Sequence, residues 1–407
     1  MRRVSTVLIV TAVCVSTGAA LAAQAPTSSA IEALVQRAMT SSPVMAEVRA
    51  GVEVARGDRL QAGLRPNPSA AVERLEQSGG RETRTSVGLV VPLDLFRRGP
   101  RVAVAEREVQ MAELEVEAVA VERAFLIRRQ AATVLAARRL VSVLENESTA
   151  MRSRVDLLTA RVEAGAGRPL DRDLALVEWR RADAERRRQE GEAGAALAEL
   201  AALVGVSPAD DLGLTRSLEE EVAAVKAPAE DAEIRRPDLR QRAVSVGKAE
   251  AERASATAEG RWDLQVSATY MNRRMNGERA HEGAIGVMVD LPLRNRQQGA
   301  VAAARAREAS ARAALENARI AAAAEVAAAR ARLSAAEAVL EQYRGGWLET
   351  AASNLAVMRE AWTLGDVTLL DVIEEERRFL MTQSEYTAAL RDVIEARAML
   401  RLALGGR

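Results

Sequence analysis

The chain has 407 residues, 57 of them basic and 57 acidic, so its formal net charge is zero and gives no electrostatic basis for binding nucleic acid. Aromatic residues make up only 2% of the chain, which excludes a large core built on aromatic side chains. The hydrophobic share of 48%, much of it alanine, together with 28% charged residues, is typical of long, closely packed helices.

The first residues have the layout of a secretory signal. Arg2 and Arg3 precede an apolar run that ends at Val15, and the small residues that follow favour cleavage after Ala23, so that 1–23 is removed. Cys14, the only cysteine, would leave with this segment, and the mature chain would have no disulfide and no thiolate metal site. No later segment approaches 18 consecutive apolar residues, so no helix is expected to span a membrane.

The rest of the chain repeats itself. Val-Pro-Leu at 91–93 is matched by Leu-Pro-Leu at 291–293, and Gly165 by Gly365, in each case 200 residues later. Before these landmarks the offset is 194, so the second half carries six extra residues, which we place at a loop tip because insertions cost little there. The predicted organisation is a first repeat over 24–205, a linker over 206–236 and a second repeat over 237–407.

Each repeat is predicted to contain a helix, two strands and a long helical hairpin. The expected helices are 28–62, 101–162, 170–204, 238–259, 300–362 and 368–404, and the expected strands are 69–75, 84–91, 262–270 and 283–291. A helix of about 60 residues is a rod of roughly 90 Å, and alanine-rich seams let two such rods pack closely as a coiled-coil hairpin. The predicted fold class is therefore mainly α, with a small β part of four strands in each chain.

The strand WDLQVSATY, 262–270, alternates apolar and polar residues, which predicts one oily and one wet face. Its length matches a tilted strand that crosses a bilayer, and its aromatic ends, roughly 26 Å apart, match the two aromatic belts of a membrane barrel. The alternative is that the strands pack on the chain's own helices, as in a soluble protein. We expect the following residues to face lipid: Trp262, Leu264, Val266, Tyr270, Ile285, Val287 and Val289.

Four strands cannot close a barrel, and an open sheet edge in lipid leaves backbone groups unpaired at a cost of several kcal/mol each. Closure must therefore come from further copies of the chain. Three copies would supply twelve strands, which enclose enough space for a channel.

The duplicated order of these elements resembles that of the TolC-like outer-membrane efflux proteins, over essentially the whole mature chain. The resemblance rests on the helix entries VVPLDLFRRG and VDLPLRNRQQG and on the turns RVEAGAGRPLDRDL and REAWTLGDVTLLDV; LRPNPSAAVE resembles the branch that serves heavy-metal pumps. It implies a homotrimer in which a twelve-stranded outer-membrane barrel continues as a helical tunnel through the periplasm. It also implies a periplasmic adaptor (membrane fusion) protein and an inner-membrane pump as partners, and no cofactor, metal or nucleic acid.

The resemblance also assigns roles to residues of the two turns, which would form the periplasmic tips. The residues implied to lie at the tip and contact the adaptor are Arg161, Gly165, Asp171, Arg359, Trp362, Leu364, Gly365 and Val367. A plain helical turn without a partner is the alternative. Val367 stands where a basic residue often links neighbouring hairpins, so a closed state that uses Arg168 or Arg172 instead is left open.

Asp371 and Glu374 match the acidic residues that narrow the tunnel in this family. They lie three residues apart and hence on one helix face, and in a trimer they would form two rings of carboxylates that attract cations. The alternative is that both are ordinary acids of the first helical turn, where they complement the helix dipole.

The sequence gives no support to an enzyme. The only histidine, His281, falls in the predicted loop between the last two strands, and no nucleophile–base arrangement, phosphate loop or two-histidine metal site is present. We therefore expect a passive outer-membrane exit duct of a tripartite efflux system. A soluble periplasmic coiled-coil scaffold or adaptor, and an outer-membrane channel for protein or polysaccharide secretion, are the alternatives. A water-filled tunnel has no discriminating pocket, so the sequence does not identify the cargo.

Overall fold

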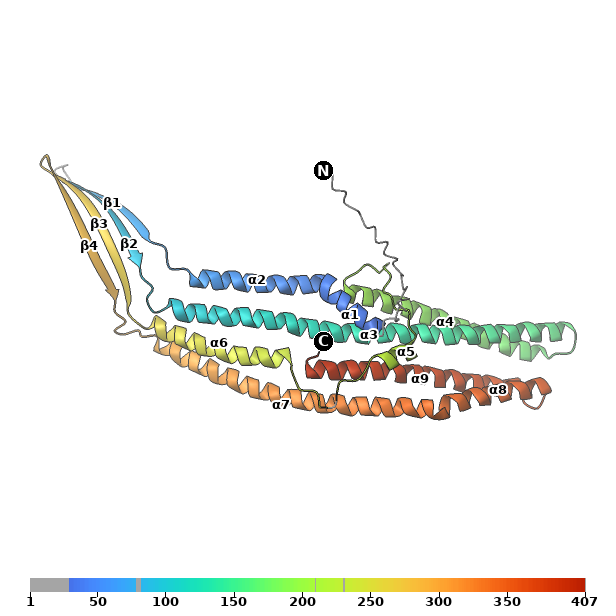
Figure 1. The fold of residues 1–407 in the computed structure, drawn as a ribbon. Helices are drawn as coiled ribbons and strands as arrows, with labels where there is room; N and C mark the ends of the chain where they lie inside the picture. Colours follow the sequence, from blue (N-terminus) through green and yellow to red (C-terminus); the bar gives the residue numbers. More distant parts are fainter. Residues whose placement is uncertain (1–28, 78–81, 209, 230, 407) are drawn as a thin grey trace, which may run out of the picture.

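A computed structural model describes residues 29–77, 82–208, 210–229 and 231–406. The molecule is elongated, with a four-stranded antiparallel sheet at one end and long paired helices along the rest of its length (Figure 1). The predicted fold class, mainly α with a small β part, is confirmed. The predicted signal segment, including Cys14, lies outside the described residues.

The first half of the chain ends in a long helical hairpin. Its elements are α1 (Ala30–Ser41), α2 (Pro43–Gly63), β1 (Ser69–Glu76), β2 (Glu82–Pro92), α3 (Arg98–Glu163) and α4 (Pro169–Val204). The single helix predicted over 28–62 is divided into α1 and α2, because Pro43 has no N–H to donate and disfavours a helical conformation of Ser42, whose ψ is 128°.

The second half repeats this order after a connecting segment that contains a short helix. Its elements are α5 (Leu218–Ala224), α6 (Pro237–Glu259), β3 (Asp263–Met275), β4 (Glu278–Asp290), α7 (Gln298–Gln342), the π-helical turn η1 (Tyr343–Trp347), α8 (Leu348–Leu364) and α9 (Leu369–Leu404). The prediction of one helix over 300–362 is wrong at η1, where Gly346 has a φ of 108°, which only glycine adopts easily.

The two β-hairpins differ in length. Strands β3 and β4 have 13 residues each, against 8 and 11 in β1 and β2. The extra residues of the second half therefore lengthen the strands and do not form a loop, because Asn276 and Gly277 (φ of 51° and 95°) make a two-residue turn. As a consequence His281, which we expected in a loop, lies within β4.

The main core lies at the middle of the molecule, where α1 packs against α3 and α4. Ile31, Ala131 and Leu200 are completely buried there. Glu32 of α1 accepts hydrogen bonds from Arg128 of α3 at 3.0 and 2.8 Å and from Arg401 of α9. Burial alone would raise the pKa of Glu32, but these two guanidinium groups outweigh it and lower the pKa. The charge network therefore fastens the N-terminal helix to the C-terminal one.

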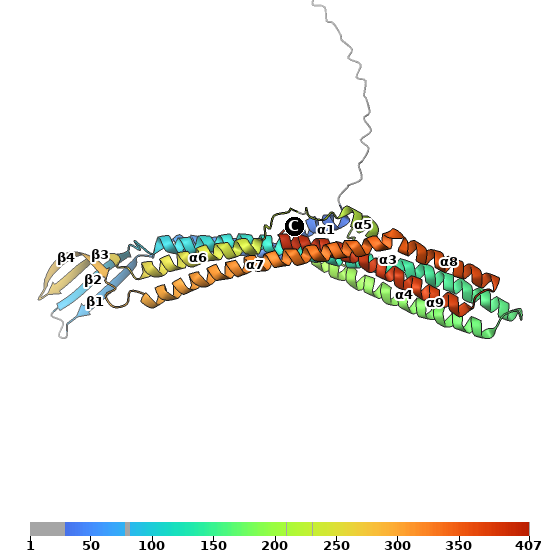
Figure 2. The ribbon, with the colours of Figure 1, turned by 90° about the horizontal axis from the view of Figure 1, so that it is seen from below.

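Both helical hairpins turn at the end of the molecule opposite the sheet, and the view from below shows that the helices bend along the way (Figure 2). None of the helices within the described residues is long and apolar enough to cross a membrane.

Candidate functional site: the apolar sheet face and the helical tips

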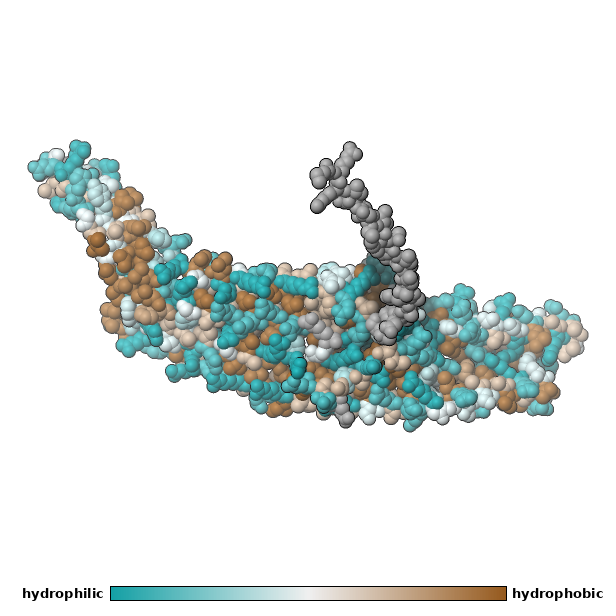
Figure 3. All heavy atoms as spheres, in the orientation of Figure 1, coloured by the Kyte–Doolittle hydropathy of each residue, from teal (hydrophilic) through white to brown (hydrophobic). Residues whose placement is uncertain are grey.

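The register of the sheet aligns the apolar residues of all four strands on one face. Val266 pairs with Val91 on one side and with Val287 on the other, and Leu264 pairs with Val289. This face is uncovered: Val287 is 64% exposed, and no strand of the described chain has extensive contacts with a helix. The apolar band is visible on the sheet next to the helices, while the far tip is polar (Figure 3). Packing of these strands on the chain's own helices is therefore excluded.

An aromatic residue lies at each end of the apolar band. Trp262 directly precedes β3 and packs edge-on against Phe96, with ring centroids 4.9 Å apart. Tyr270 is half exposed, and its hydroxyl lies 2.6 Å from Nδ1 of His281, which is two residue pairs closer to the tip. The phenol ring thus belongs to the band while its hydroxyl points toward the polar tip, an arrangement suited to a membrane interface.

The two helical tips are built on glycines with positive φ. Gly165 has a φ of 72° and Gly365 a φ of 87°. In each turn the following residue closes the helix: Ala166 donates its N–H to the carbonyl of Arg161 at 2.9 Å, and Asp366 donates to that of Ala361 at 3.0 Å. A side chain at either glycine would cost about 1–2 kcal/mol in this left-handed conformation.

Of the other residues expected at the tip, Leu364 is 72% exposed and Arg161 is also exposed, whereas Val367 is half buried. Trp362 does not present its ring outward. It packs against a small core, and the guanidinium groups of Arg161 and Arg154 lie 6.0 and 5.8 Å from its ring centroid. Trp362 therefore stabilises the tip from within.

Asp171 is paired inside its own turn. Arg168 donates to both of its carboxylate oxygens, at 3.0 and 3.2 Å. Arg172, the other arginine considered for a link between hairpins, is paired with Asp173 at 2.7 Å. A link to a neighbouring hairpin through Asp171 would therefore have to displace Arg168.

Asp371 and Glu374 are both exposed near the start of α9. Asp371 also belongs to a capping box, since Thr368 donates to its carboxylate from N–H at 2.8 Å and from the hydroxyl at 2.6 Å. These bonds lower the pKa of Asp371, which is therefore charged at neutral pH. Glu374 has one ion-pair partner among the described residues, Arg378 at 4.0 Å. Both carboxylates are exposed, and Asp371 caps the helix as well.

A buried charge cluster behind the tip was missed from the sequence. Glu376 of α9 is 1% exposed and binds Arg154 of α3 (2.7 Å for one of its two contacts) and Arg359 of α8 (2.8 and 3.0 Å). Arg359 also donates to Glu147 at 2.7 Å. The guanidinium of Arg359, which we expected to contact an adaptor, is thus held within its own chain. A glutamate within the apolar stripe that contains Leu369 was the signal for such a buried charge.

The pKa values of the two acids of this cluster are shifted in opposite directions. Burial raises the pKa of Glu147; Arg359 opposes this effect, but the negative charge of Glu376 adds to it. For Glu376, burial also acts to raise the pKa, but Arg154 and Arg359 together outweigh it and lower the pKa. The cluster is therefore centred on an ionised Glu376 that holds α3, α8 and α9 together.

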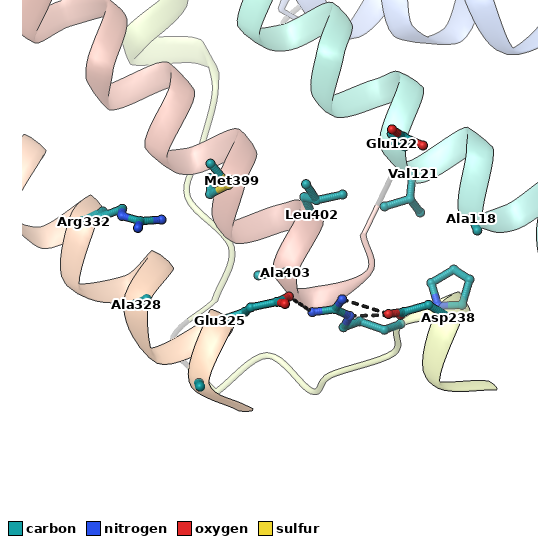
Figure 4. A pocket seen from close by; sticks show the side chains of 13 residues that line it. Ala118, Val121, Glu122, Asp238, Glu325, Ala328, Arg332, Met399, Leu402 and Ala403 are labelled. Atoms are coloured by element: carbon teal, nitrogen blue, oxygen red, sulfur yellow. Dashed lines mark hydrogen bonds and ion pairs between the residues drawn. The ribbon is translucent and has the colours of Figure 1, made fainter. Parts of the chain in front are cut away.

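A cavity of about 620 Å³ is lined by α3, α6, α7 and α9 (Figure 4). None of the residues predicted to form the constriction or the tip contacts lines it. There Arg236 forms ion pairs with Asp238, at 2.8 Å, and with Glu325. Within the described residues, no group of three or more His, Cys, Asp or Glu side chains could hold a metal ion.

Comparison with known proteins agrees with this geometry. The family model described as "Outer membrane efflux protein" matches residues 229–406. The nickel-cobalt-cadmium resistance protein NccC of Alcaligenes xylosoxydans xylosoxydans is 27% identical over 318 residues, covering 75% of this chain and 70% of NccC. Crystal structures of CusC match with a TM-score of 0.79 and 17% identity, over 93% of this chain and 92% of CusC. The outer membrane protein VceC of Vibrio cholerae matches with a TM-score of 0.74 and 20% identity, over 92% and 96%.

The fold and the uncovered apolar sheet define an outer-membrane channel whose helices extend into the periplasm. The second half of the chain matches the model of the outer membrane efflux protein family, and the whole chain has the fold of solved outer-membrane channels. These similarities are those of an outer-membrane efflux channel and not of an enzyme, and channels of this kind work with a periplasmic adaptor and an inner-membrane pump.

Proposed function

We propose that three copies of the chain close a twelve-stranded barrel, through which substrates leave the cell passively. The observation that carries this proposal is the uncovered apolar sheet, whose outer strands β1 and β4 each have one unpaired edge in the single chain. Unpaired strand edges are not tolerated in lipid, and pairing β1 of one copy with β4 of the next satisfies all of them. Light scattering of the detergent-solubilised protein should give the mass of three chains, and a single-chain mass would contradict the proposal.

The exposed part of the helical tips is proposed to bind the adaptor. Leu364 and the two turn glycines present apolar side-chain and backbone surface, and Leu170, 65% exposed at the start of α4, adds to it. Trp362 and Arg359 act from behind this surface, because their contacts lie within the chain.

A photo-crosslinker at Leu364 tests this orientation in cells that express the adaptor and the pump. Leu60 is a matched control, because it is equally exposed (69%) but lies on α2 toward the sheet. We expect adaptor capture at Leu364 only, and capture at Leu60 only would reverse the orientation.

Asp371 and Glu374 are proposed to form the constriction, where three copies would place six carboxylates around the lumen. Two observations support this constriction: both residues are exposed at the tip end of α9, and Asp371 is ionised. Such rings favour cations over anions. Docking of the adaptor would widen this end, with η1 as the hinge, because Gly346 interrupts the helix ladder between α7 and α8.

We further propose divalent metal cations as a cargo. The similarity to NccC, described as a nickel-cobalt-cadmium resistance protein, and the negative charge of the proposed constriction support this cargo. A deletion strain should become sensitive to these metals and regain resistance with the intact gene. Unchanged metal tolerance, with raised sensitivity to other compounds, would point to a different cargo.

A further inference from the structure

Beyond the apolar band, the two faces of the sheet carry opposite charges. On the face that continues the band, the charged residues are three arginines and one glutamate: Arg74, Arg274, Arg279 and Glu76. On the opposite face of the described strands they are two arginines and four glutamates: Arg84, Arg273, Glu73, Glu82, Glu278 and Glu282. We call the first group the outer basic rim. Beyond the band, one face of the two hairpins therefore has a net positive charge and the other a net negative charge.

Two of the three arginines of the outer basic rim lack the partners that the inner ones have, whereas the third, Arg74, lies 3.9 Å from Glu76. On the inner face, Glu82 lies 2.7 Å from Arg273 and 3.6 Å from Arg84. On the outer face, Arg274 and Arg279 are paired directly across β3 and β4, and within the described residues neither forms an ion pair. Like charges placed opposite each other in a sheet are destabilising unless an anion compensates them.

The outer basic rim begins at the height of a lipid headgroup layer and ends just above it. The rim begins two residues beyond Tyr270, at the level of Arg74, and ends two residues further on, at Arg274 and Arg279. With a rise of about 3.3 Å per residue, these levels lie about 7 and 13 Å beyond the Tyr270 ring, or about 5 and 10 Å above the hydrocarbon for a strand tilted by about 40°. The headgroup layer of a bilayer is about 5–8 Å thick on each side.

We propose that the outer basic rim binds the phosphate groups of lipids in the outer leaflet of the outer membrane. This inference rests on the proposed barrel, which makes the apolar face lipid-facing. Guanidinium groups bind phosphate oxygens in a bidentate manner, and a lipid phosphate is carried to this height by acyl chains that cover the apolar band below it. A phosphate without acyl chains would gain only its contacts with the exposed arginines.

The test uses the purified full-length protein in zwitterionic detergent micelles, titrated with dye-labelled lipid A, an acylated and doubly phosphorylated disaccharide, by fluorescence anisotropy. The first variant replaces all three rim arginines (Arg74→Gln, Arg274→Gln, Arg279→Gln). The matched variant replaces the inner arginines (Arg84→Gln, Arg273→Gln). Each arginine near an anionic lipid surface is worth about a fivefold change in affinity.

We therefore expect the rim variant to bind lipid A at least about tenfold more weakly, with the affinity of the wild type falling as salt is added, and the inner variant to bind as the wild type does. Equal affinity of the wild type and the rim variant would overturn the inference, as would displacement of lipid A by millimolar inorganic phosphate. Trimer mass and channel conductance are measured on the same samples. If they are normal while lipid A binding is unaffected by the rim variant, this inference fails and the proposed channel stands; if no trimer forms, the channel itself is contradicted.

Discussion

Replacing Glu376 by glutamine should destabilise the tip half of the protein strongly. The carboxylate is 1% exposed and binds both Arg154, whose side chain is 10% exposed, and Arg359. Glutamine keeps the shape but leaves these two guanidinium groups without their main counter-charge. Breaking a buried pair in this way costs about 3–5 kcal/mol. We expect the lower end of this range, because Arg359 is partly exposed and keeps Glu147.

The free energy of unfolding is measured on the detergent-solubilised protein by denaturant titration, followed by the helical circular dichroism signal. Glu360→Gln serves as the matched control, because Glu360 lies on α8 next to Arg359 but is exposed, and such surface changes stay within about 0.5 kcal/mol. If Glu376→Gln costs no more than Glu360→Gln, the buried cluster does not hold the tip helices together.

The difference in the free energy of unfolding between the wild type and Glu376→Gln depends on pH. The pKa of Glu376 is lowered in the folded chain, so its stabilisation is complete above the pKa of an unfolded glutamate, about 4.3, and is lost as the pH falls through the lower folded value. The stability gap between the wild type and Glu376→Gln should therefore be constant at neutral pH and narrow below about pH 4. If the stability difference below about pH 4 equals that at neutral pH, Glu376 is not the ionised group described above.

Three further predictions concern the membrane face, the constriction and the tip. Val266→Arg should lower the yield of assembled trimer in membranes, because a charge near the middle of the lipid face costs roughly 2–4 kcal/mol, whereas Thr269→Arg on the opposite face should assemble normally; equal yields would contradict the assignment of the faces. Replacing both Asp371 and Glu374 with alanine should raise single-channel conductance in planar bilayers and weaken block by divalent cations, and unchanged conductance would end their role as the constriction. Gly365→Ala, at a φ of 87°, should cost about 1–2 kcal/mol and weaken adaptor crosslinking, and wild-type values for both would show that the left-handed turn is not needed.

The sequence predicted the fold class and the apolar sheet face because both depend on local periodicity. Alternation at Leu264, Val266 and Tyr270 fixes which side chains share a face, whatever the rest of the chain does. The full length of β3 and β4 was not predicted, because the polar residues around His281 resemble a loop and only the Asn-Gly pair at the turn indicates that the strands continue.

The charge cluster could not be predicted residue by residue. It joins Glu376 to Arg154, 222 positions earlier, and it forms only where α3, α8 and α9 converge. The inward orientation of Trp362 has the same origin, since the small core that it packs against includes Val155 and Leu158 of the first repeat. The roles given to Asp371, Glu374 and the outer tip residues stay predictions.

Contact between hydrocarbon and one face of the sheet is tested most directly by single cysteines along β3, from Leu264 to Tyr270, in the trimer reconstituted into lipid vesicles. Spin labels at these positions report collisions with oxygen, which concentrates in lipid, and with a water-soluble nickel complex. Oxygen contact should be high at Leu264, Val266 and Tyr270 and nickel contact high at Gln265 and Thr269, with a strict period of two. Nickel contact at every position would show that water, and not lipid, covers the apolar face, and would contradict the account.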